Sequence, residues 1–255
     1  MTQAASQSAE AAIEAEALSH IELGAVLCFV AGAINAGGFL AVGMYTSHMS
    51  GVVSAMADNA VLGRWLLVWI GLWSLLAFIG GAMTTALMVR WALRRNLRSA
   101  YSRPLLVEAI LLLVFGIFGA AIDAHSMALV PYTVVLLCFI MGLQNALITK
   151  RSNAEIRTTH ITGLVTDLGI ELGNLFYVNR SFPDAPKVRA NRTKIGNHLK
   201  LLLSFILGAL SGAWGFKAVG YSATVVLALI LVMLVVRPLW FDFQAWRTRW
   251  LGRAG

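Results

Sequence analysis

Charged residues are scarce in this chain. Only 13% of its 255 residues are Asp, Glu, Lys or Arg, whereas 58% are hydrophobic and the mean hydropathy is +0.75. A soluble domain carries about a quarter of charged residues, so this chain cannot cover a surface that faces water. We therefore expect lipid to be its solvent and its spanning segments to be helices, because backbone groups in lipid must pair within the segment.

Two further features are missing. Residues 1–22 contain no Lys or Arg and so lack the basic region of a secretory signal, which predicts a mobile, partly helical cytoplasmic tail. Cysteine occurs only twice, at Cys28 and Cys138, each inside an apolar run. We interpret both as buried thiols that behave as small hydrophobic residues, rather than as a disulfide or metal ligands.

Sequence signatures of soluble enzymes are also absent. The chain has no Gly-x-x-x-x-Gly-Lys-[Ser/Thr] loop, no Gly-x-Ser-x-Gly turn and no His-Glu-x-x-His helix. Transport driven by ATP bound to this chain is not expected, and neither is a cofactor or a metal site. Whether the chain is an enzyme stays open, with the balance against it. The net charge of +8 indicates membrane topology rather than nucleic-acid binding, since the basic residues lie in short segments between apolar runs.

Six apolar runs are long enough to cross about 30 Å of hydrocarbon, which takes about 20 helical residues. They cover 23–42, 65–89, 104–123, 132–149, 198–216 and 219–237. Two other segments are ambiguous. Residues 48–62 are too short to span, and 159–177 carry Asp167 and Glu171.

The basic residues favour six crossings. With the N-terminus inside and only the six runs crossing, 18 of the 20 Lys and Arg residues lie in the cytoplasm, and only Arg64 and Lys217 lie outside. If both ambiguous segments also crossed, the split would be 11 to 9. The first topology obeys the positive-inside rule. It predicts a multi-pass protein with both termini in the cytoplasm.

The chain also repeats itself. Residues 27–36 (LCFVAGAINA) resemble 137–146 (LCFIMGLQNA), and 46–51 (TSHMSG) resemble 158–163 (TTHITG). This predicts two membrane repeats, 23–130 and 131–238, between an acidic tail at 1–22 and a basic, aromatic interfacial tail at 239–255. Because each repeat would hold three crossings, the second repeat enters from the opposite side and the repeats are inverted.

The ambiguous segments then approach from opposite faces, as re-entrant or interfacial short helices. A linker from Met44 to Ser47 reaches only about 14 Å when extended. A deep re-entrant segment in the first repeat therefore predicts that the first helix ends early, at Gly37-Gly38. The spacing of Gly208 and Gly212 suits close helix packing.

These paired motifs, Gly-x-x-Asn-Ala followed by a Thr/Ser-rich x-[Ser/Thr]-Gly segment, resemble the YoaK-type family of bacterial multi-pass membrane proteins. The resemblance covers roughly 22–237. It implies a multi-pass membrane fold in the bacterial plasma (inner) membrane but no established reaction. In that family the segment often reads Met-Thr-Gly-Asn, whereas Val52 and Leu164 occupy the Asn position here. No role of that Asn is carried over.

The duplicated cluster is the candidate binding site. Ser47 and Thr159 are residue types that cap helix N-termini, where free N–H groups and a partial positive charge favour anions. Gly51 and Gly163 would allow close approach of backbone or ligand. The expected solute-binding set is Asn35, Thr46, Ser47, His48, Ser50, Gly51, Asn145, Thr158, Thr159, His160, Thr162 and Gly163. Each of these types also caps or packs ordinary helices.

Four titratable residues are candidates for proton coupling: His48, Asp58, His160 and Asp167. Carboxylates inside a membrane are functional candidates, but Asp58 and Asp167 are equally consistent with contact to water at an interface. Asn35 and Asn145 match across the repeats and are expected to bind each other or to line one polar path. Glu108 follows Arg103 closely, so we expect its side chain to reach the cytoplasmic interface.

Two classes of function follow from these patterns. One is a secondary transporter or channel for a small polar or anionic solute, with its site between inverted repeats. The other is a membrane scaffold, a sensor or a lipid-handling enzyme. Homo-oligomers are compatible with both. The two classes differ in whether the titratable residues converge near the middle of the membrane.

Overall fold

Helices make up the part of the chain that the computed structural model describes, which is residues 20–125, 130–152, 158–179 and 187–251. No strand occurs among these residues. The helices are α2 (His20–Val42), α3 (Met49–Val61), α4 (Trp65–Arg94), α5 (Ser102–His125), α6 (Val130–Arg151), α7 (Ile161–Phe176), α8 (Arg192–Val219), a 3-10 turn η3 (Gly220–Ser222) and α9 (Ala223–Leu251). The predicted N-terminal tail lies outside the described residues up to residue 19, and α2 begins at His20.

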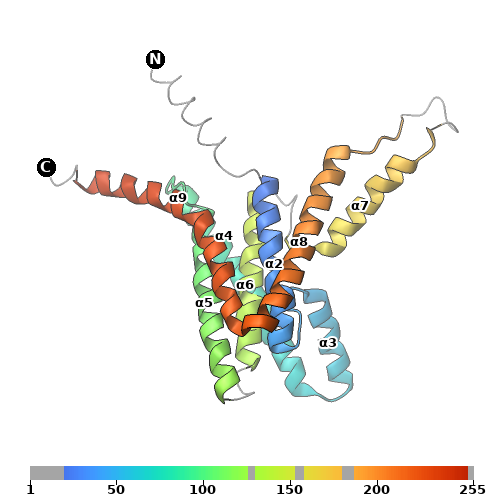
Figure 1. Cartoon of the computed structure of the whole chain (residues 1–255), viewed down its shortest axis with the longest axis horizontal. Helices are drawn as coiled ribbons and strands as arrows, with labels where there is room; N and C mark the ends of the chain where they lie inside the picture. Colours follow the sequence, from blue (N-terminus) through green and yellow to red (C-terminus); the bar gives the residue numbers. More distant parts are fainter. Residues whose placement is uncertain (1–19, 126–129, 153–157, 180–186, 252–255) are drawn as a thin grey trace.

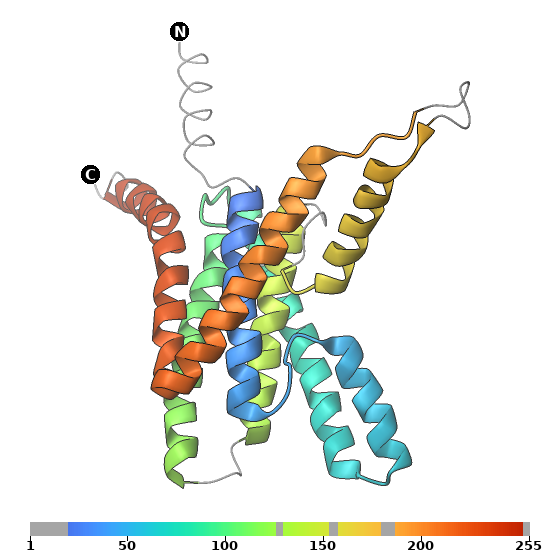
Figure 2. The same ribbon diagram turned by 45° about the vertical axis from the view of Figure 1, so that its right-hand side comes forward.

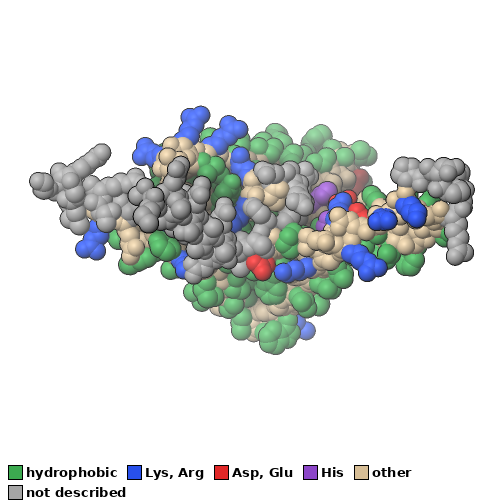
Figure 3. Space-filling model, turned by 90° about the horizontal axis from the view of Figure 1, so that it is seen from above, with side chains coloured by type: hydrophobic (Ala, Val, Ile, Leu, Met, Phe, Trp, Pro, Cys, Tyr) green, Lys and Arg blue, Asp and Glu red, His purple; other side chains and the backbone are tan. Residues whose placement is uncertain are grey.

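The six long helices alternate in direction. The first residues of α2, α5 and α8 lie at the same end of the molecule as the last residues of α4, α6 and α9 (Figures 1 and 2). That end is basic, because the final turns of α4 and α6 carry Arg94, Lys150 and Arg151. Figure 3, viewed onto this end, shows Lys and Arg side chains over several elements. Arg64 and Lys217 lie next to the turns at the opposite end.

The helices are apolar and long enough to place the protein in a membrane. In the described residues, four stretches qualify as candidate spans: Ile21–Val42, Trp65–Arg94, Val130–Arg151 and Arg192–Gln244, the last of which joins α8 to α9. These stretches cover five of the six predicted spans. The predicted span 104–123 corresponds to α5, which is not among them, so the six-crossing topology stays a prediction. Large apolar side chains face outward along α4, including Trp65, Trp69 and Trp73, as expected for contact with lipid.

Two helix pairs dominate the packing, α2 with α8 and α4 with α6. Gly208 of α8 leaves no room for a Cβ atom against the backbone of Phe29, and Gly81 of α4 leaves none against the backbone of Phe139. Phe29 and Phe139 occupy matching positions in the two repeated decapeptides. The first long helix of each repeat therefore packs backbone-to-backbone against the second long helix of the other repeat. Helix α2 packs against α8 in this way, and α6 packs against α4. The expected close packing at Gly208 and Gly212 is confirmed, since Gly212 lies against the backbone of Ala33.

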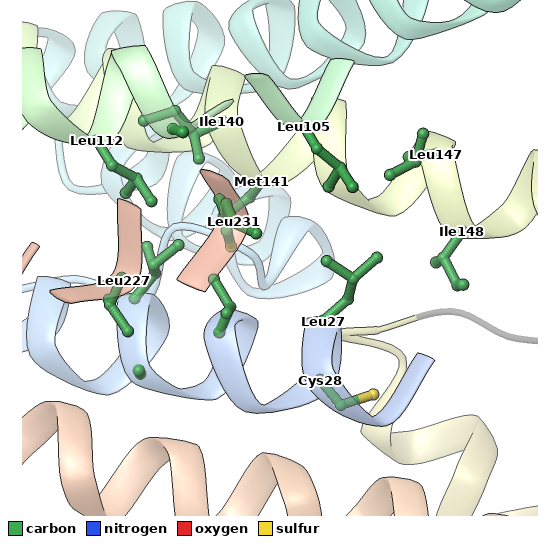
Figure 4. Packing of buried hydrophobic residues seen from close by; sticks show 14 of the residues in the cluster. Leu27, Cys28, Leu105, Leu112, Ile140, Met141, Leu147, Ile148, Leu227 and Leu231 are labelled. Carbon is green, nitrogen blue, oxygen red and sulfur yellow. The ribbon is translucent and has the colours of Figure 1, made fainter. Parts of the chain in front are cut away.

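The core lies where α2, α5, α6 and α9 meet (Figure 4). Leu27, Leu112, Ile140 and Leu231 are all fully buried there. Residues 27–38 and 137–148 have the same sequence of buried and half-buried positions, residue by residue. The repeated sequence therefore folds into two helices with equivalent surroundings.

The ends of α2 and α9 bear on two local expectations, and α2 agrees with the predicted span 23–42. Helix α2 does not end at Gly37-Gly38 but continues to Val42, because these glycines pack against Phe216 and Leu137 instead of breaking the helix. The linker to α3 covers residues 43–48, because α3 begins at Met49. At the other end of the chain, α9 continues through Pro238 to Leu251 and bends along its length (Figure 1), and an interfacial position of its last part stays a prediction.

Candidate functional site

Two short helices begin next to one another at mid-height of the molecule. In both views, the starts of α3 and α7 lie side by side, and the helices then run towards opposite ends (Figures 1 and 2). Each forms a hairpin with the long helix that follows, α3 with α4 and α7 with α8. The duplicated Thr-x-His-x-x-Gly clusters are therefore brought together, although 112 positions separate them in the sequence.

The matched asparagines anchor these helix starts. The hydroxyl of Ser47 donates to Asn35 Oδ1 at 2.8 Å and its backbone N–H donates at 3.4 Å. In the second repeat, Asn145 Oδ1 accepts from the Thr159 hydroxyl at 2.9 Å, the Thr159 N–H at 3.3 Å and the Thr158 hydroxyl at 3.3 Å. Each asparagine thus holds the segment that follows it in its own repeat. The first of the two expected arrangements, in which the asparagines bind each other, is not found, and a shared polar path stays a prediction.

Histidine, rather than Ser or Thr, occupies the N-cap position. His48 precedes α3 and His160 precedes α7, and neither side chain makes a capping hydrogen bond. The expected caps, Ser47 and Thr159, are one residue earlier, and their hydroxyls are engaged by the asparagines. The N–H groups of the first turns therefore lack a side-chain acceptor at the cap and an acceptor within the helix.

Each histidine ring folds back over its own helix. A Cβ atom on Gly51 would overlap the His48 ring, and a Cβ atom on Gly163 would overlap the His160 ring. Glycine three residues after the histidine is thus required for this ring position. Although the sequence predicts that these glycines allow approach of a ligand or of backbone, the histidine ring occupies that space in the structure.

Some residues of the two clusters are exposed to the surroundings, and others are fully buried. His48, Ser50, His160 and Thr162 are exposed. Thr46 and Thr158 are fully buried, and the Thr46 hydroxyl has no hydrogen-bond partner among the described residues. The Thr158 carbonyl accepts a weak bond from the Cys28 thiol at 3.5 Å, which ties α2 of the first repeat to the second cluster. Both cysteines are buried and free.

The two aspartates do not join the histidines. Asp58 is ten residues beyond His48, a rise of about 15 Å along α3, and it is exposed near the end of that helix. Asp167 lies 4.0 Å from His198 Nε2 of α8. Because α3 and α7 run in opposite directions from their starts (Figure 2), Asp58 and Asp167 lie farther along these helices and not at the helix starts.

Sequence reasoning missed several polar contacts that depend on helix pairing. Glu171 is buried against α8, where its carboxylate accepts the Asn191 N–H at 2.9 Å and lies 3.8 Å from Lys194 Nζ. Asp242 of α9 accepts the N–H groups of Arg98 and Ser99 at 3.0 and 2.9 Å, which fixes the turn between α4 and α5. No pattern within one helix signals such partners.

Glu108 contradicts its expected position. It is fully buried, and neither carboxylate oxygen has a hydrogen-bond partner in the described structure. The side chain therefore does not reach the cytoplasmic interface, because α5 presents it on the same buried stripe as Leu105 and Leu112. Gln144, which follows the repeated glycine by two residues, is equally buried and unpaired.

Metal ligands and surface pockets are the other features that could mark a ligand site in the described part of the chain. Among the described residues, no group of three His, Cys, Asp or Glu side chains is placed to hold a metal ion. A surface pocket of about 300 Å³ lies instead at the far end of α7, lined by residues that include Asn174, Tyr177, Asn179, Arg189 and Arg192. The predicted solute-binding residues do not contribute to it.

Comparison with known proteins places the chain in a family. A family model described as "Protein of unknown function (DUF1275)" matches residues 23–237, which covers both repeats. The chain belongs to this family. It is also 28% identical over 157 residues to "UPF0700 transmembrane protein YoaK" of Bacillus subtilis (strain 168), an alignment that covers 60% of this chain and 67% of that protein. No solved structure matches it.

The family match confirms the resemblance drawn from the paired motifs and agrees with the membrane assignment. It supplies no reaction, substrate or partner. Any function must therefore be argued from the geometry at the starts of α3 and α7.

Proposed function

We propose that this protein is a secondary transporter or channel for a small polar or anionic solute, and that two inverted repeats form its site where α3 and α7 begin. The observation that carries the proposal is the side-by-side placement of two helix N-termini whose helices run to opposite ends of the molecule (Figures 1 and 2). Half-helices of this kind commonly form solute sites between inverted repeats.

Inversion is supported by the directions of the long helices. Helix α2 starts at the basic end of the molecule, whereas its counterpart α6 finishes there. The exchanged packing, α2 against α8 and α6 against α4, is what a two-fold axis between the repeats would produce. With the basic end in the cytoplasm, the positive-inside rule gives six crossings in the inner membrane, with both termini inside.

Electrostatics favours a negative or strongly polar solute. Each helix N-terminus carries the equivalent of about half a positive charge from its unpaired N–H groups. Two such termini reinforce each other when they face the same space. The exposed hydroxyls of Ser50 and Thr162 add donors, and no carboxylate of α3 or α7 is placed at the helix starts to oppose an anion.

The histidines would link the solute to protons. His48 and His160 are exposed at equivalent N-caps. Each ring fits there because Gly51 or Gly163, three residues later, has no side chain in its place. A protonated imidazole beside a helix N-terminus would raise affinity for an anion, whereas loss of the proton would lower it. Asp58 and Asp167 lie along diverging helices, so they are weaker candidates for direct coupling.

A scaffold or sensor role is the second candidate. It is favoured by the backbone-to-backbone packing at Gly81 and Gly208, which resists relative movement of the helices that carry the short segments. Under that role the duplicated clusters would serve to build the fold and would bind nothing.

Solute uptake separates these functions. The purified full-length protein would be placed in liposomes, and the swelling rate would be followed under gradients of small inorganic anions, amino acids, neutral polyols and divalent metal salts. We expect faster entry of one class of solute, with anions the most favoured, and loss of that entry in Gly163→Val. A Gly173→Val protein is the matched control, because Gly173 lies in the same helix with open space around it. Equal rates with and without protein for every solute would contradict the proposal.

A further inference from the structure

The core contains two polar side chains that the solute site does not use. Glu108 of α5 and Gln144 of α6 are each 0% exposed, and all four of their terminal atoms lack a hydrogen-bond partner among the described residues. A buried polar group without a hydrogen-bond partner destabilises a protein, and an unpaired buried charge does so more strongly. Two such groups in the same core therefore require an explanation.

The register of α5 and α6 places them at the same level. The helices run in opposite directions and pack together. Leu105 and Leu112 of α5 belong to the same buried cluster as Ile140 and Leu147 of α6 (Figure 4). Glu108 lies between the two leucines on α5, and Gln144 lies between Ile140 and Leu147 on α6, so both side chains belong to the layer that this cluster forms.

Among the described residues, neither oxygen of Glu108 has a hydrogen bond to a charged partner. Helix α5 packs against α4, α6, α9 and η3. The ionisable groups on those elements lie towards the helix ends or away from this layer: Arg90 and Arg94 on α4, Cys138, Lys150 and Arg151 on α6, Tyr221 on η3, and Arg237 and Asp242 on α9. On α5 itself, Arg103 is more than one turn from Glu108.

We propose that Glu108 and Gln144 form a buried proton-binding site. Neither side chain has a hydrogen-bond partner in the described structure, so both must rotate to pair. In the acid form, Glu108 then donates its O–H to Gln144 Oε1 and accepts an N–H from Gln144 Nε2 at its other oxygen. One proton thus satisfies both residues through two complementary hydrogen bonds. Uptake converts the Glu108 carboxylate to the acid, and release returns the carboxylate and one proton. This inference rests on burial and register and is independent of the proposed solute site.

The repeat provides the natural comparison. Ile34 stands in the first decapeptide where Gln144 stands in the second, and it is also buried. The same helical position therefore accepts an aliphatic side chain of similar size. Gln144→Ile copies a residue that this fold already tolerates and removes only the partner of the acid.

Infrared spectroscopy tests the proposal directly. The full-length protein in liposomes at neutral pH should show the carbonyl stretch of a protonated carboxylic acid, absent in Glu108→Gln. Gln144→Ile should keep the band but move it to higher frequency, because the acid loses its hydrogen-bond partner. Glu171→Gln is the control and should leave the band unchanged.

Either variant alone can overturn the proposal, so the test does not require both to fold. A spectrum of Glu108→Gln identical to that of the unsubstituted protein would overturn the site. If that variant cannot be purified, Gln144→Ile decides, since a band at the original frequency would show that the two residues do not pair. Loss of solute uptake with an unchanged infrared band would count against the proposed transport function but not against this site.

Discussion

Replacing Asn145 by Leu should release the start of α7. The side chain keeps a similar size but loses the oxygen that accepts three hydrogen bonds, two from Thr159 and one from Thr158. A typical hydrogen bond contributes about 1 kcal/mol net, and two of these three are long, so we expect a loss of about 2–3 kcal/mol in local stability. Asn35→Leu removes two bonds from Ser47 and should cost about 1–2 kcal/mol.

Amide hydrogen exchange in detergent micelles or liposomes measures this effect where it occurs. Exchange at the first turn of α7 should quicken by roughly 30- to 150-fold in Asn145→Leu, the factor that 2–3 kcal/mol corresponds to. Exchange in α2 should change little. The matched control is Asn59→Leu, because Asn59 is an α3 asparagine whose amide binds only the Ala55 carbonyl of its own helix. Unchanged exchange at residues 159–163 in Asn145→Leu would refute the assignment of Asn145 as the anchor.

Three further outcomes are expected. Gly81→Ala and Gly208→Ala should each lower the free energy of unfolding by about 1–3 kcal/mol through overpacking, whereas Gly173→Ala should not. Chemical denaturation in micelles measures this free energy. Unequal losses at Gly81 and Gly208 would argue against a two-fold arrangement. Asp242→Ala should loosen the turn at residues 97–99 and speed its proteolysis, and equal cleavage rates would show that these bonds are dispensable. Asp167→Asn should change stability by less than about 1 kcal/mol, since its contact with His198 is long and half exposed; a larger loss would indicate a buried role.

Much of the fold follows from the sequence because lipid imposes simple rules. The six runs predicted from hydropathy coincide with α2, α4, α5, α6, α8 and α9, and the two ambiguous segments coincide with α3 and α7. The basic residues near Arg94 and Lys150 do gather at one end of the molecule. Which end faces the cytoplasm stays a prediction.

The site was harder to predict, since it depends on contacts between helices. The paired clusters and the asparagines stood out in the repeated sequence, yet nothing in the pattern indicated that Asn35 binds Ser47 rather than Asn145. Ser and Thr are usual N-caps, so the sequence predicts Ser47 and Thr159 at these positions. The N-caps are instead the next residues, because the hydroxyls of Ser47 and Thr159 donate hydrogen bonds to the asparagines. Glu108 was misjudged because its distance from Arg103 was counted along one helix, without the neighbours that bury it.

The central claim is that α3 and α7 begin inside the membrane at one shared, water-accessible site. Single cysteines at Ser50 and Thr162, which are exposed and equivalent, test it in a background of Cys28→Ala and Cys138→Ala. In liposomes, both should react with a small water-soluble thiol reagent, and spin labels on the pair should lie closer together than a bilayer half-thickness of about 15 Å. Unreactive cysteines, or labels farther apart than that, would contradict a shared site.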